Sequence, residues 1–159
     1  STTLFASDQN LKQAVESPDA SEILKKDALP PPTTYTMPKD CITKDKKRIE
    51  NGRIFFNNLN SDAAKIKTAD GKLKQYGNCI ACHNIEQGEG PGNIGPDLTN
   101  YNEIYVKSGV REGAWIYQKI ADPRIDNPNT TMVVSLTNKT MTEQEVCDVV
   151  SYILADKTK

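Results

Sequence analysis

The chain has little of what several functional classes need. It holds one histidine, and its formal net charge at pH 7 is −1. This charge balance provides no basic surface for nucleic acid and no cationic face for an anionic membrane. No apolar run approaches the length that spans a bilayer. A charged-then-apolar leader is also missing at Ser1, so we expect a mature chain from which a signal peptide has been removed.

Hydrophobic residues are also scarce, at 36% of the 159 residues, which is low for one domain of this length. A large buried apolar cofactor would supply the missing core material. The four cysteines are Cys41, Cys79, Cys82 and Cys147, and their number alone does not decide the redox compartment. One short stretch, YGNCIACHNIEQ at 76–87, contains two of these cysteines and the single histidine.

The pattern predicts an all-α domain that follows an N-terminal extension. Residues 1–42 have thin apolar faces and the proline run LPPPTTYTMP, which favours a stiff segment that is loose or lies along a partner. Residues 43–159 are expected to form the domain. The polar stretch 60–75, with its Asp-Gly turn signal, is predicted to be a surface insertion.

Two helices are predicted from apolar periodicity. The first begins near Thr43 and places Phe56 on the same face as Gly52, so another helix is expected to approach closely at the glycine. The second is expected at 111–121, where Pro123 stops it. Its inward residues would be Trp115, Ile116 and Ile120.

A third helix near the end of the chain has the clearest start. Thr142 and Glu145 have the spacing of a capping box, and Met141 and Val146 have that of a hydrophobic staple. Beyond them an apolar stripe continues to Leu154. No internal repeat is apparent.

The pattern Cys79-Ile80-Ala81-Cys82-His83 is the attachment signature of c-type haem. Each thiol adds across one vinyl group of the porphyrin, and the histidine after the second cysteine supplies the proximal iron ligand. We therefore expect one covalently bound haem c, with thioethers at Cys79 and Cys82 and with His83 on the iron.

Two other uses of the cysteines compete with this interpretation. A redox dithiol would need a βαβ context, and no strand pattern is visible. A zinc site would have to recruit Cys41 and Cys147, which lie far apart and lack paired spacing. Haem attachment is the interpretation that we carry forward.

The second axial ligand cannot be another histidine of this chain. The three methionines are Met37 in the proline-rich extension, Met141 in the staple, and Met132 in a loop between two helices. A thioether that reaches the other face of the ring needs such a loop, so we predict Met132, with a lysine or an open position as alternatives.

Further residues have candidate supporting roles. The carbonyl of Pro96 is a reasonable acceptor for the second ring N–H of the proximal histidine; alternatively, Gly-Pro at 95–96 is simply a turn. Cys41 and Cys147 would meet in a disulfide if the first and last helices cross, or remain two buried thiols. Arg111 and Arg124 are candidates for haem propionates.

The order of these elements resembles the monohaem cytochrome c fold over about residues 43–156. More closely, GNCIACH, GPGNIGPDL, IADPRIDNPNTTM and TEQEVCDVVSYI resemble SoxX, the small cytochrome subunit of the SoxAX complex in bacterial thiosulfate oxidation. The ADPR…NP-T-M run is the most specific part. The resemblance implies the same thioether, proximal and distal residues as above, although Val133 and Val134 stand where the family often has prolines.

The resemblance also implies a function and a location. In the family, the SoxA partner joins thiosulfate oxidatively to a cysteine of the carrier SoxYZ, and the complex can include a third small subunit. SoxX is the non-catalytic electron-transfer subunit of this L-cysteine S-thiosulfotransferase: its haem accepts the electrons and passes them to a downstream cytochrome. Haem c attachment implies export, so the periplasm is expected. The competing hypotheses are a free-standing periplasmic electron shuttle, a gas-binding haem sensor and a zinc-stabilised module.

Overall fold

The computed structural model describes residues 30–57, 78–90 and 92–156. The predicted surface insertion at 60–75 lies outside these residues, as does most of the predicted extension. The chain divides into two units, and the second of them spans residues 31–159. This second unit contains the haem-attachment motif and all three methionines.

Three α-helices dominate the described part of the chain: α3 at Lys46–Phe56, α4 at Gly113–Ala121 and α5 at Glu143–Leu154. Short 3₁₀ turns lie at Cys79–Ala81 (η2) and Pro123–Ile125 (η4), and a π-helical turn lies at Asn102–Val106 (η3). No strand occurs among the described residues, so the prediction of an all-α fold is confirmed. None of these helices is long and apolar enough to cross a membrane.

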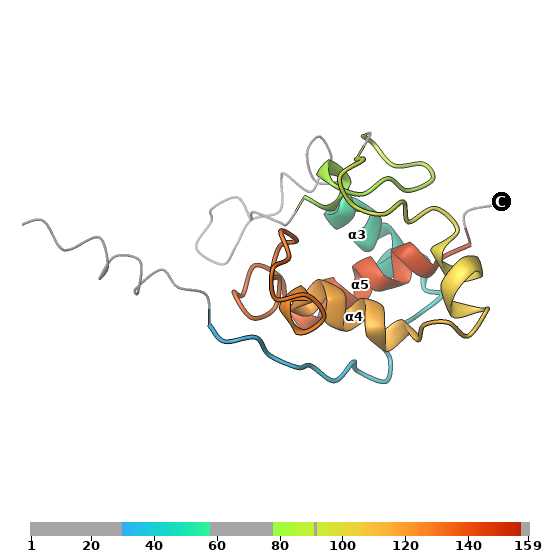
Figure 1. Cartoon of the computed structure of the whole chain (residues 1–159). Helices are drawn as coiled ribbons and strands as arrows, with labels where there is room; N and C mark the ends of the chain where they lie inside the picture. Colours follow the sequence, from blue (N-terminus) through green and yellow to red (C-terminus); the bar gives the residue numbers. More distant parts are fainter. Residues whose placement is uncertain (1–29, 58–77, 91, 157–159) are drawn as a thin grey trace, which may run out of the picture. The chain divides into compact units, whose positions relative to one another are not determined.

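Helices α3 and α5 pack against each other (Figure 1). They come closest at Gly52 of α3, which lies against Asp148 and Tyr152 of α5. A Cβ atom at this position would overlap the backbone carbonyl of Asp148 and come within 2.8 Å of the Cβ of Tyr152. The close approach that the mid-helix glycine predicted is thus present. Phe56 packs edge-to-face on the ring of Tyr152, with 5.6 Å between ring centroids.

Helix α4 begins two residues later than predicted and ends at Ala121 as expected. Asp122 then takes an extended conformation with φ −152° and ψ 95°, and Pro123 opens the next turn. Ile116 and Ile120 are buried. Trp115 is only partly buried, because it forms part of a cavity wall.

Helix α5 has both parts of the predicted capping box. The Thr142 hydroxyl accepts a hydrogen bond from the Glu145 backbone N–H, and the Glu145 carboxylate accepts one from the Thr142 N–H. Met141 and Val146 are both buried, as the staple requires. This helix is buried from Val146 to Leu154, so it forms the centre of the core.

Residues 33–41 of the predicted extension lie against the domain. The amide of Gln118 accepts a hydrogen bond from the Tyr35 N–H at 2.7 Å and donates one to the Thr33 carbonyl at 3.1 Å. A disulfide then joins Cys41 to Cys147 on α5. These residues contact their own chain, although the predicted boundary between residues 42 and 43 stays a prediction.

Candidate functional site

The haem-attachment motif folds as one tight turn. Within η2, the Cys79 carbonyl accepts hydrogen bonds from the N–H of Cys82 at 3.1 Å and of His83 at 2.9 Å. Two thiols and an imidazole are therefore held on a short rigid element, as stepwise covalent attachment of one flat group would require.

A glycine-rich loop packs on the other side of this turn. The N–H groups of Ile94 and Gly95 both donate to the Cys82 carbonyl, at 3.1 Å and 2.7 Å. A Cβ at Gly92 would overlap backbone atoms of the motif, including the His83 N and O. The loop therefore needs glycine here because its backbone lies directly on the turn.

His83 is oriented by this same loop. Its Nδ1 lies 2.8 Å from the carbonyl oxygen of Pro96, the residue predicted as the acceptor. With Nδ1 as donor, Nε2 is left unprotonated and available as an iron ligand. The ring also packs on Gly95, where an added Cβ would lie 2.7 Å from Nδ1.

A cavity of about 390 Å³ opens beside the motif. Its wall brings together Cys79, Cys82 and His83 with Met132, although the methionine lies some fifty residues further along the chain. Met37 and Met141 are not among the residues described as lining the cavity. Met37 packs against the core and Met141 is buried in it.

The cavity wall also carries charge from α4 and its flanks. Arg111, Lys119 and Asp126 all line the cavity, and Lys119 pairs with Asp126 at 2.5 Å. Lys119 and Asp126 were not predicted as site residues, although Lys119 follows Trp115 by one helical turn on the same face. Arg124 does not line the cavity, because its guanidinium is paired with Asp122.

Aromatic rings fix the position of Arg111. Its guanidinium carbon lies 3.9 Å from the centroid of the Trp115 ring and 5.1 Å from that of Tyr105. One of its nitrogens donates to the Tyr101 hydroxyl at 3.3 Å. This bond is the main cause that raises the pKa of Arg111, so the group stays cationic at the cavity.

Burial raises the pKa of the Cys79 thiol to about 12. The thiol is therefore neutral in the chain before a group is attached. The remaining two cysteines are not available for attachment of a group, because Cys41 and Cys147 form the disulfide, with 4.7 Å between their Cα atoms. A zinc site built from all four cysteines is incompatible with this pairing.

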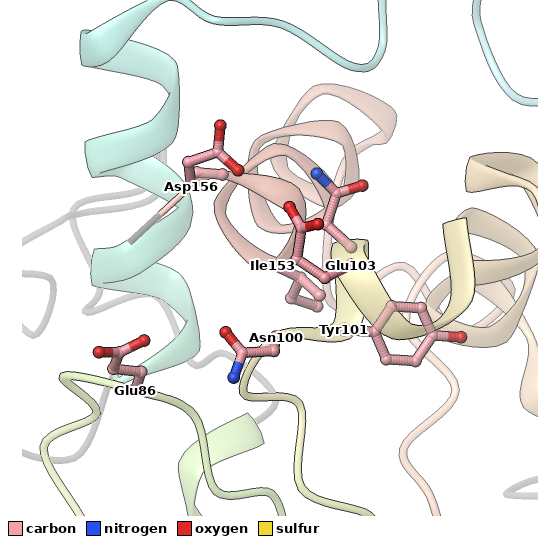
Figure 2. A pocket seen from close by; sticks show the side chains of 8 residues that line it. Glu86, Asn100, Tyr101, Glu103, Ile153 and Asp156 are labelled. Carbon is pink, nitrogen blue, oxygen red and sulfur yellow. The ribbon is translucent and has the colours of Figure 1, made fainter. Parts of the chain in front are cut away.

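A second, smaller cavity of about 100 Å³ lies elsewhere on the domain and was not predicted. Figure 2 shows Asn100, Glu103, Ile153 and Asp156 around it. Lys107 pairs with both Glu103 and Asp156. Of the three carboxylates that line this cavity, Glu103 and Asp156 are therefore engaged by a lysine of the same chain.

The fold and the cavity define a small all-α protein with a covalent haem-attachment site. Residues 63–156 match the family model described as Cytochrome c. The chain belongs to the cytochrome c family, and haem c, bound covalently through the cysteines of its CxxCH motif, is its cofactor. No curated protein matches the chain.

The residues present fit this cofactor. The cavity wall is largely apolar, its two thiols are on one turn, and the imidazole beside them already has a partner for its second nitrogen. Gly95 leaves the space that a histidine ring needs. Cationic Arg111 and Lys119 lie on the same cavity, where acidic groups of a bound haem would find partners.

Proposed function

We propose that this chain is the electron-transfer subunit of a SoxAX-type complex that oxidises thiosulfate. The observation that carries the proposal is the meeting of Cys79, Cys82, His83 and Met132 on one cavity. Its specific support is the run at 120–132, IADPRIDNPNTTM, which ends in that methionine and resembles the SoxX pattern.

We propose His83 and Met132 as the axial ligands of the iron. The bound haem supplies reversible one-electron chemistry, and a His/Met pair favours a raised reduction potential with no open position for substrate. The protein's own contribution is positional. The Pro96 carbonyl orients the imidazole, and the loop that follows η4 brings the thioether to the cavity.

The groups at the cavity suit electron transfer better than catalysis. Apart from the attachment motif, its described polar lining consists of Asn78, Arg111, Lys119, Asp126, Thr130, Thr131 and Ser135. The best candidate for a proton-transfer group, Asp126, is paired with Lys119, which lowers its pKa. Asp126 therefore stays charged near neutral pH and is not poised for acid–base chemistry.

In the proposed complex, the chemistry takes place on the partner SoxA. There a cysteine thiol of the SoxYZ carrier forms a sulfur–sulfur bond with thiosulfate, and the thiol proton and two electrons are released. This chain receives the electrons and passes them to a downstream cytochrome, so it is a non-catalytic subunit. Haem c attachment further supports a periplasmic location.

One observation favours the free-standing shuttle as a second candidate. An extension is of little use to a shuttle and would suit a partner, but residues 33–41 are held by Gln118 and by the disulfide within their own chain. Within the extension, only the residues before position 33 therefore favour the hypothesis of a partner subunit.

Co-expression with a SoxA-type subunit and haem-maturation proteins tests the proposal. We expect a red heterocomplex that survives dilution and whose haem on this chain is reduced when thiosulfate and the carrier are both added. A Cys79→Ala/Cys82→Ala variant, which cannot attach haem, is the control for the origin of the spectrum. A red monomer that never joins the partner would support the shuttle instead.

A further inference from the structure

The loop that carries Met132 is closed at its neck by two hydrogen bonds. The Thr137 hydroxyl donates to the Asp122 carboxylate at 2.7 Å, across a separation of 15 residues. Beside it, the Leu136 N–H donates to the Ala121 carbonyl at 3.0 Å. The end of α4 and the start of the segment that leads to α5 are thereby joined.

The neck is buried, whereas the tip of the loop is open. Asp122 is 0% and Thr137 9% exposed, whereas Val133, next to the methionine, is 47% exposed. Within the tip, the backbone N–H of Met132 donates to the nearby Thr130 hydroxyl at 3.1 Å. Hydrogen bonds between the two ends of the loop therefore concentrate at the neck.

The buried carboxylate at the neck is fully partnered. The Arg124 guanidinium donates to both oxygens of Asp122, at 2.9 Å and 2.8 Å. Its two-point geometry compensates a charge that would otherwise be costly to bury. Arg124 lies within the loop itself, so this pair holds the first part of the loop as well.

Residues 33–35 reinforce the neck from outside. The Thr33 N–H donates to the Asp122 carboxylate at 3.0 Å. The Tyr35 hydroxyl lies 3.0 Å from the Thr137 hydroxyl oxygen. Because Thr137 gives its single proton to the carboxylate, Tyr35 is the donor in this second bond.

We propose that Asp122 and Thr137 are positioning residues for Met132, and that residues 33–35 act as a strap that keeps the neck closed. The strap and neck then set how often the thioether leaves the iron. The inference rests on the proposed ligation by Met132. Opening of the loop breaks bonds that are present only in the closed state, so weakening them raises the open population.

The test is the affinity of the ferric haem protein for imidazole, which binds only when the methionine has left. Thr137→Val keeps the shape of the side chain and removes both hydroxyl bonds. We expect its apparent imidazole affinity to rise about tenfold, since a hydrogen bond to a charged, buried group is lost. Tyr35→Phe removes one neutral bond, and a rise of about threefold is expected.

Ser151→Ala is the matched control. Ser151 is buried and holds the far end of the same segment: its hydroxyl donates to the Cys41 carbonyl and accepts from the Thr43 N–H. None of these bonds involves the loop. We expect this variant to lose global stability without a change in imidazole affinity beyond about twofold.

The outcomes separate the two proposals. If wild-type protein lacks the methionine-to-iron charge-transfer band, then ligation by Met132 fails and the positioning role fails with it. If the band is present but Thr137→Val matches Ser151→Ala in imidazole affinity, only the positioning role is overturned. Should Thr137→Val not fold, Tyr35→Phe decides, and an unchanged affinity in that variant overturns the proposal.

Discussion

The imidazole ring of His83 rests on Gly95, with no room for a side chain between them. A Cβ at this glycine would lie 2.5 Å from Cε1 and 2.7 Å from Nδ1 of the ring. The glycine is adjacent to Pro96, whose carbonyl orients the same ring. One dipeptide thus sets both the tilt of the imidazole and its hydrogen bond.

Gly95→Ala is therefore expected to displace the proximal histidine. Overpacking of this kind costs about 1–3 kcal/mol, and the ring or the loop must move. We expect a lower yield of haem-loaded protein and a changed reduction potential, measured by redox titration. Gly90→Ala is the control from the same loop, because its added Cβ meets Ile80 at an ordinary 3.4 Å. Equal effects of the two variants would contradict this account.

Met132→Ala is expected to abolish the methionine-to-iron charge-transfer band of the ferric protein and to allow carbon monoxide to bind the ferrous form readily. The reason is that the thioether is the proposed sixth ligand. Absorption spectra with and without carbon monoxide measure both effects. Met37→Ala, which alters a methionine outside the cavity, should keep the band. A band that persists in Met132→Ala would remove this residue as the ligand.

Removal of the disulfide is expected to destabilise the domain without a change at the haem. Cys41 and Cys147 are separated by 106 residues, and closure of so long a loop strongly reduces the conformational entropy of the unfolded chain. The Cys41→Ala/Cys147→Ala variant should lose about 2–5 kcal/mol in free energy of unfolding, measured by denaturant titration. Its visible spectrum should match wild type, and reduction of wild-type protein should reproduce the loss.

The Asp122 carboxylate should make stability depend on acid pH. Arg124 foremost, together with Thr137 and the Thr33 N–H, holds the pKa of Asp122 well below its usual range. A depressed folded-state pKa contributes stability above the unfolded value of about 4, and this contribution disappears as the pH falls further. Asp122→Asn should cost about 1–3 kcal/mol at pH 7 and flatten the acid side of the stability profile.

Glu50→Gln is the comparison for this acid effect. Arg53 lowers the pKa of Glu50 as well, but the pair is exposed, with side-chain exposures of 34% and 53%. An exposed pair contributes only about 0–1 kcal/mol. Glu50→Gln should therefore change the acid side of the stability profile much less than Asp122→Asn. Equal changes would show that burial of the Asp122–Arg124 pair does not cause the acid dependence.

Tyr117 should make the stability of the protein depend on pH under alkaline conditions. Burial raises its pKa to about 12, and its hydroxyl has no hydrogen-bond partner among the described residues. The unfolded tyrosine ionises near pH 10, so stability falls by about 1–3 kcal/mol as the pH rises from 10 to 12. Tyr117→Phe should be nearly neutral at pH 7 and should lose less over this range, measured by chemical unfolding at each pH. Parallel curves for the two proteins would contradict the prediction.

Local signals in the sequence were sufficient to predict the helices α3, α4 and α5. The capping box at Thr142 and Glu145 and the glycine at 52 are short-range patterns whose chemistry does not depend on the remainder of the fold. The haem-attachment motif is of the same kind. The family match confirms the class of cofactor that the motif predicts.

The rest of the site depends on which segments, distant in the sequence, lie together in the fold. The spacing of apolar residues along the sequence does not predict these long-range contacts. Lys119 and Asp126 line the cavity because α4 and η4 turn at Asp122. The role of Asp122 itself follows from partners at positions 33, 124 and 137. Trp115 was expected in the core, but the cavity interrupts the core at that point and leaves the ring partly exposed.

The disulfide also has a consequence for how the protein matures. Four cysteines allow three fully paired arrangements, and all three use the thiols that haem attachment needs; two of them also pair Cys41 and Cys147 with the wrong partners. Once Cys79 and Cys82 have become thioethers, Cys41 and Cys147 are the only pair that remains. Attachment of the haem before oxidation therefore removes every wrong disulfide, whereas oxidation first puts the protein's redox function at risk.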